Sequence, residues 1–168
     1  MHIAKLGVIC LALYGLAIMQ NTAQAQRIMP NTMAIQVALM LDALTVIFAS
    51  RNQPEGRYDG LRPEVIVALE AAPPSMIIEG ELTAPWPDGL IEAAPFSGDP
   101  NFARIHMEQV PATLCKDLAV ILINQENVIG LYIGGQQIPT EERTLGEFIE
   151  LITPQCGAAP VTIDVIIG

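Results

Sequence analysis

Hydrophobic residues cover almost every face of the segment 32–50, TMAIQVALMLDALTVIFAS, which contains no glycine or proline. Asn31 or Thr32 can cap the helix that this segment predicts. A helix that is apolar all round is either buried on several sides or packs against another subunit. Asp42 is the one charged residue of this segment and argues against a membrane span. A second membrane-spanning helix is the alternative, since the length of the segment is only just sufficient to cross a bilayer. We expect its interaction surface, against a partner or the chain's own sheet, to comprise Met33, Val37, Met40, Leu44 and Phe48.

The segment that follows this helix is irregular. After a loop rich in Pro, Gly, Asn and Asp, Pro63 begins a short helix over 63–70. Prolines then recur through 72–100, which excludes a regular helix there and leaves only short extended pieces.

From residue 102 onward, the hydrophobic pattern changes repeatedly between the two-residue period of a strand and the 3.6-residue period of a helix. Ala103, Ile105 and Met107 share one face of a strand, and Arg104 and His106 share the other. We expect a strand over 102–107, a helix over 111–124, and two strands over 128–133 and 136–138 that are joined by a turn at Gly134-Gly135. A further helix begins at the capping box of Thr144 and Glu147 and ends before Pro154. The last expected element is a strand over 161–167. A long N-terminal helix packed on an antiparallel sheet is an α+β fold.

The N-terminus has the pattern of a secretory signal peptide. Lys5 lies in a short basic start, an unbroken apolar run covers 8–19, and Ala23 and Ala25 stand at the −3 and −1 positions of a cleavage site. The run is too short to span a bilayer, which takes about 20 apolar residues. We therefore predict a signal peptide over 1–25, cleavage between Ala25 and Gln26, and a single exported domain over 26–168 without a stable membrane span.

Charge and cysteine content narrow the function classes. The net charge is −10, and basic residues form no cluster, so nucleic-acid binding is not expected. Cys10 would leave with the signal peptide, and Cys115 and Cys156 remain. An even pair in an exported chain favours one disulfide, the alternatives being two free thiols or two metal ligands.

The residues do not form a recognisable catalytic set, so we expect neither an enzyme nor a cofactor or metal. His106 is the one histidine after the signal peptide, and its place on the polar face of a strand predicts an ordinary solvated side chain. The sequence holds no Gly-x-Ser-x-Gly elbow and no phosphate-binding glycine loop. Trp86, between two prolines, is expected to cover a loop rather than to form an exposed contact.

A series of short motifs resembles the type IVb pilins, in particular the thin-pilus conjugative and toxin-coregulated kinds. Each motif is short, and the resemblance rests on their shared order over about 33–167. The motifs are Ala34-Ile35-Gln36-Val37-Ala38-Leu39 in the long helix, Arg57-Tyr58-Asp59-Gly60-Leu61, Pro74-Ser75-Met76, Ala94-Pro95-Phe96-Ser97-Gly98, Phe102-Ala103-Arg104-Ile105, Val110-Pro111, Cys115-Lys116-Asp117-Leu118, and Cys156 with the strand that follows it.

The resemblance implies a pilin-like domain whose two cysteines form a disulfide that defines the D region. It also implies that the partners are pilin subunits or pilus-assembly proteins and that the chain can form oligomers. The N-terminus departs from the family, because a leader cut after Gly7 would place Ala12 where a pilin has glutamate. We therefore expect a secreted or periplasmic pilin-like structural or interaction protein. A divergent prepilin cleaved after Gly7, and an unrelated exported ligand-binding or enzymatic α+β domain, are the alternatives.

Overall fold

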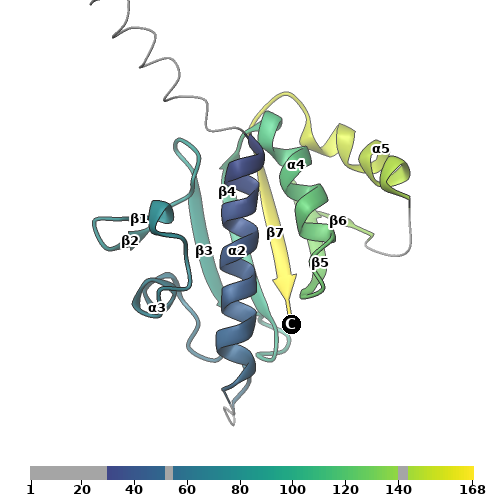
Figure 1. Ribbon diagram of the computed structural model, residues 1–168. Coiled ribbons are helices and arrows are strands. Elements are labelled where there is room, and N and C mark those ends of the chain that lie inside the picture. Colours follow the sequence, from purple (N-terminus) through teal and green to yellow (C-terminus); the bar gives the residue numbers. More distant parts are fainter. Residues whose placement is uncertain (1–29, 52–54, 140–143) are drawn as a thin grey trace, which may run out of the picture.

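The computed structural model describes residues 30–51, 55–139 and 144–168 (Figure 1). The expected signal peptide, its cleavage site at Ala25 and Gln26, and the alternative junction after Gly7 lie outside the described residues.

The first described element is a long helix, α2 (Pro30–Ala49), and it confirms the helix predicted from the hydrophobic pattern, although it begins before the expected cap at Asn31 or Thr32. Proline suits the first position of a helix, since the N–H that it lacks would have no partner there. One face of α2 is buried at three- and four-residue spacing. The buried side chains are Ala34, Val37, Ala38, Met40, Leu41, Leu44 and Phe48.

A five-stranded sheet forms the centre of the molecule, and every pair of neighbouring strands is antiparallel. The strand order is β3-β4-β7-β5-β6, so the last strand of the chain lies in the middle. The strands are β3 (Leu90–Pro95), β4 (Ala103–Val110), β5 (Val128–Ile133), β6 (Gln136–Ile138) and β7 (Val161–Ile167). The α+β class is therefore confirmed.

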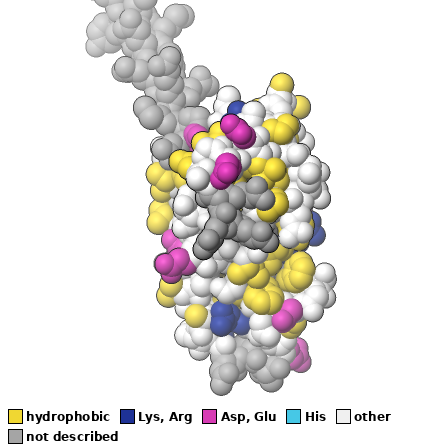
Figure 2. All heavy atoms as spheres, turned by 90° about the vertical axis from the view of Figure 1, so that its right-hand side faces the viewer, with side chains coloured by type: hydrophobic (Ala, Val, Ile, Leu, Met, Phe, Trp, Pro, Cys, Tyr) yellow, Lys and Arg dark blue, Asp and Glu magenta, His cyan; other side chains and the backbone are white. Residues whose placement is uncertain are grey.

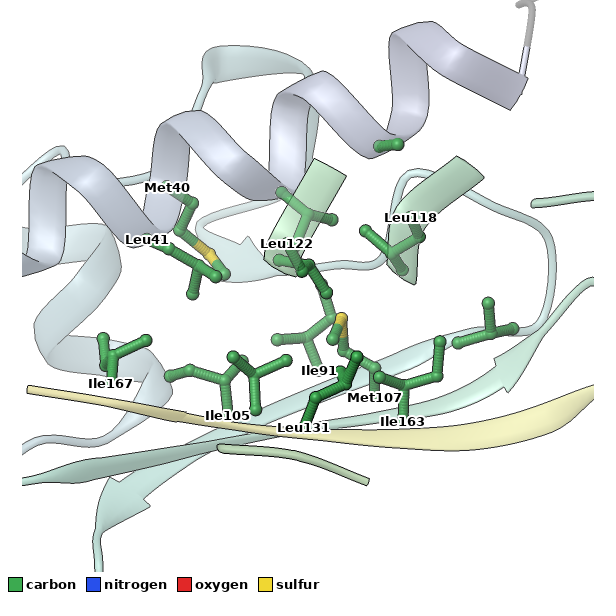
Figure 3. Close-up of a cluster of buried hydrophobic side chains, with 14 of the residues drawn as sticks. Met40, Leu41, Ile91, Ile105, Met107, Leu118, Leu122, Leu131, Ile163 and Ile167 are labelled. Atoms are coloured by element: carbon green, nitrogen blue, oxygen red, sulfur yellow. The ribbon is translucent and has the colours of Figure 1, made fainter. Parts of the chain in front are cut away.

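Two helices cover one face of this sheet. In Figure 1, α2 and α4 (Ala112–Ile123) lie side by side across the strands. Figure 3 shows the core between the two layers, with side chains from both helices pointing toward the strands. The labelled residues are Met40 and Leu41 of α2, Leu118 and Leu122 of α4, and Ile91, Ile105, Met107, Leu131, Ile163 and Ile167 of the sheet. The polar residues of the strands alternate onto the opposite face, which no described helix covers.

Small elements flank β3. They are α3 (Pro63–Ala68), a 3-10 turn (Pro74–Met76), and the two-residue strands β1 (Ile77–Ile78) and β2 (Glu81–Leu82), which pair as a hairpin (Figure 1). Trp86 in the next loop is buried, and its indole N–H donates to the Glu108 carbonyl oxygen at 3.0 Å. The prediction that Trp86 covers a loop is confirmed.

The last helix, α5 (Leu145–Cys156), begins as predicted and ends later than predicted. The Thr144 hydroxyl accepts from the Glu147 N–H at 3.3 Å, and the Glu147 carboxylate accepts from the Thr144 N–H at 2.9 Å. The expected end before Pro154 is wrong, because Pro154 lies inside the helix. So close to the C-terminal end, a proline removes one backbone hydrogen bond without breaking the helix, and Cys156 fixes the last turn to α4 through a disulfide.

Candidate interaction surfaces

A disulfide joins the first turns of α4 to the end of α5, as the cysteine pair predicts. The sulfur atoms of Cys115 and Cys156 are 2.04 Å apart, and both residues are fully buried. The bridge encloses β5, β6 and α5 in one loop, so the outer helix is attached to the core covalently as well as by packing.

The disulfide-closed segment exposes hydrophobic side chains on α5. Leu145 is 57 % exposed and Ile149 is 39 % exposed. Figure 2 faces the side of the molecule on which α5 lies, and hydrophobic side chains form patches there with charged side chains dispersed between them. Exposed apolar patches of this kind mark contact surfaces when they are contiguous.

The helix residues expected to form an interaction surface pack against the chain's own sheet. Val37, Met40, Leu44 and Phe48 are fully buried, and Met33 packs partly buried against the same core. Of the two partners considered for this face, the sheet is the one present. Packing against the chain's own sheet, one of the two alternatives expected for these five residues, is therefore the one observed, because their spacing places them on the inward side of α2.

The opposite side of α2 carries a different apolar row. Ile35, Leu39 and Val46 are 47 %, 54 % and 72 % exposed, and Asp42 between them is also exposed. These four residues, which we call the outer α2 stripe, follow one another at helical spacing and share one face. The stretch Thr32–Ala49 is long and apolar enough to cross a membrane by length and composition, and its buried face also forms the core.

A polar cluster lies on the uncovered face of the sheet, where β4 and β7 pair. The register sets His106 opposite Asp164, and the His106 Nδ1 is 2.7 Å from an Asp164 oxygen. The Arg104 Nε donates to the same carboxylate at 2.7 Å, and His106 Nε2 lies 3.1 Å from the Glu108 carboxylate. His106 thus bridges two carboxylates, with Arg104 beside it.

These contacts favour the charged forms of the groups. Burial acts most strongly on His106 and would lower its pKa, but the hydrogen bonds to Asp164 and Glu108 together raise that pKa above its ordinary 6.5. Burial likewise opposes the charge of Asp164, yet hydrogen bonds from Arg104 and His106 bring its pKa below the ordinary 3.8. The two carboxylates therefore favour the protonated form of His106.

The cluster is suited to joining strands rather than to activating a nucleophile. Within the described ranges, His106 is hydrogen-bonded to Asp164 and Glu108, and to no hydroxyl or thiol. Among those same residues, no group of three or more His, Cys, Asp or Glu side chains could hold a metal ion. The prediction of an ordinary solvated His106 is corrected: the side chain is on the polar face but is paired across strands. Alternation alone could not reveal this, since the partner depends on the strand register.

Comparison of the chain with protein-family models, with curated proteins and with solved structures gives no match.

Proposed function

We propose that this chain is an exported pilin-like structural or interaction protein of a type IVb or related conjugative pilus system. The observation that carries the proposal is a long helix, α2, that lies along an antiparallel sheet, together with the Cys115–Cys156 bridge, which encloses β5, β6 and α5. The order of motifs along the sequence supports the same assignment. The chain would act through surfaces, in the periplasm, on the cell surface or after secretion.

Two surfaces are suited to such contacts. The outer α2 stripe offers three large apolar side chains in a row, and α5 offers Leu145 and Ile149. Apolar side chains exposed in rows are costly in water, and burying them against a partner removes that cost. We assign the outer α2 stripe to pilin or assembly-protein contacts and the α5 face to recognition.

The first experiment determines the N-terminus and intact mass of the full chain after expression in a Gram-negative host. The proposal expects a soluble product that starts at Gln26 and is two hydrogens lighter than its reduced form. A product that starts at Val8 in a membrane or pilus fraction would contradict this proposal and favour the filament-forming prepilin. A product that keeps its full leader in the cytoplasm would contradict export altogether.

The second experiment tests the partner. The exported chain is used to capture proteins from the envelope of a piliated Gram-negative strain, and pilus subunits or assembly proteins are expected in the captured fraction. Leu39→Asp should abolish their capture, because it places a charge in the outer α2 stripe. Ile129→Asp is the matched control, since Ile129 is 49 % exposed and lies outside both proposed surfaces. Equal capture by Leu39→Asp and the unmodified chain would contradict the assignment of this stripe.

A further inference from the structure

One edge of the central sheet is open. β3 is an outer strand, and its ladder with β4 continues to a hydrogen bond from the Phe96 N–H to the Phe102 carbonyl at 2.9 Å. Hydrogen-bonded pairs alternate along an antiparallel ladder, so Leu90, Glu92 and Ala94 use their backbone groups toward β4. The N–H and C=O groups of Ile91 and Ala93 therefore point away from the sheet. In the described part of the chain these groups have no hydrogen-bond partner.

A groove lies beside this edge. It is a cavity of about 340 Å³ between α3, the β1–β2 hairpin and β3, and in Figure 1 α3 and the hairpin lie beside β3 at the outer edge of the sheet. Its apolar lining includes Val67 of α3, Leu82 of β2 and Ile91 of β3, of which the last two are buried. Leu90, which is 43 % exposed, also lines the groove, so part of the accessible surface beside the open strand edge is apolar.

The rim of the groove is acidic. Glu64, Glu81 and Glu92 line it, and all three are exposed. Glu64 has a cation nearby, Arg62 at 3.6 Å. Arg104 also acts on Glu92 electrostatically, but its guanidinium is hydrogen-bonded to Asp164. The register also sets Glu92 opposite His106, whose ring is hydrogen-bonded to Asp164 and Glu108. With three glutamates on the rim, the groove nevertheless has a negative field.

We propose that this groove binds an extended basic segment of a partner protein, which pairs with β3 as an added strand. Ile91 and Ala93 would supply the backbone hydrogen bonds, the apolar lining would accept alternate side chains, and lysine or arginine would meet Glu81 and Glu92. Pro95 ends the pairing, because it has no N–H to offer.

Charge argues against a second copy of this chain as the occupant. Two β3 edges paired with each other would bring their Glu92 side chains close together, and like charges opposed across strands are unfavourable. The net charge of −10 adds a repulsion between copies. The same carboxylates that prevent self-pairing attract a cationic segment.

The test measures binding of a fluorescein-labelled peptide of alternating lysine and valine to the full exported chain by fluorescence anisotropy. We expect saturable binding that the double substitution Glu81→Gln, Glu92→Gln weakens about tenfold, as the loss of two exposed ion pairs would. The matched control, Glu126→Gln with Glu150→Gln, removes the same charge elsewhere and should leave the affinity unchanged. Equal weakening by both double variants would overturn the proposal in favour of nonspecific attraction.

A second probe tests strand addition itself. A lysine–valine peptide that is N-methylated at every residue keeps its charge but has no backbone N–H to donate and carries methyl groups along both edges, so it cannot pair with a strand edge. We expect it not to bind, and binding equal to that of the parent peptide would overturn the proposal. The inference does not rest on the proposed pilus function, because Leu39→Asp, which tests that function, should bind the parent peptide normally.

Discussion

Among single residues, Tyr58 places a hydroxyl in the core without a hydrogen bond from any described residue to offset its burial. Tyr58 is fully buried and stacks on Phe48 with ring centroids 5.3 Å apart. Its hydroxyl has no hydrogen-bond partner among the described residues. The ring therefore stabilises the junction between α2 and the loop after it, while the hydroxyl is buried without compensation.

We predict that Tyr58→Phe leaves the packing intact and raises the free energy of unfolding by about 1 kcal/mol, because it removes an unsatisfied buried group. Urea unfolding should show a higher midpoint with an unchanged slope. Tyr58→Ala is the companion variant and should lower stability by about 3–5 kcal/mol through loss of the ring. A lower midpoint for Tyr58→Phe would mean that the hydroxyl is hydrogen-bonded in solution.

His106 makes stability depend on pH. Its pKa in the fold is raised above 6.5, so its contribution is complete below pH 6.5 and is lost as the pH rises through the higher folded value. We predict that the melting temperature of the unmodified chain falls over this range more than that of His106→Gln. The other titrating groups are common to both chains, so the difference between their pH profiles isolates His106. Parallel profiles would contradict the prediction.

At the scale of elements, the capping box sets where α5 begins. Thr144 and Glu147 exchange side-chain and backbone hydrogen bonds and satisfy N–H groups that the helix itself cannot. We predict that Thr144→Ala lowers the free energy of unfolding by about 1 kcal/mol in urea titration. Thr144→Ser keeps the hydroxyl and should stay within a few tenths of a kcal/mol of the unmodified chain. Equal losses in both variants would assign the effect to the threonine methyl group.

Elements with a clean period could be predicted from the sequence almost residue by residue. The strands Val128–Ile133 and Val161–Ile167 have the predicted bounds because alternation and the Gly134–Gly135 turn act locally. The predicted strand over 102–107 was too short, since β4 continues to Val110 past Gln109, whose φ of 54° shifts the register there. Such a bulge interrupts alternation without ending the strand.

At the scale of the whole molecule, the sheet order was not accessible to pattern analysis. β7 lies between β4 and β5 through contacts between distant parts of the chain, and periodicity carries no information about such neighbours. For this reason His106 and Asp164, 58 positions apart, could not be paired from the sequence. The inward side of α2, by contrast, is the predicted row from Met33 to Phe48, and only the presence of the sheet decides that the chain's own strands rather than a partner cover it.

The disulfide is the whole-molecule feature that was predictable, and it should account for much of the stability. Cys115 and Cys156 are 41 positions apart, and closing a loop of that length in the unfolded chain stabilises the fold by about 4 kcal/mol in the chain-entropy model. We predict that Cys115→Ala with Cys156→Ala lowers the free energy of unfolding by roughly this amount, which is large against the 5–15 kcal/mol of a typical domain. Dithiothreitol should destabilise the unmodified chain similarly and leave the double variant unchanged. If the reductant destabilised both proteins equally, its effect would not come from this bridge, and a double variant as stable as the unmodified chain would show that helix packing alone holds α5 in place.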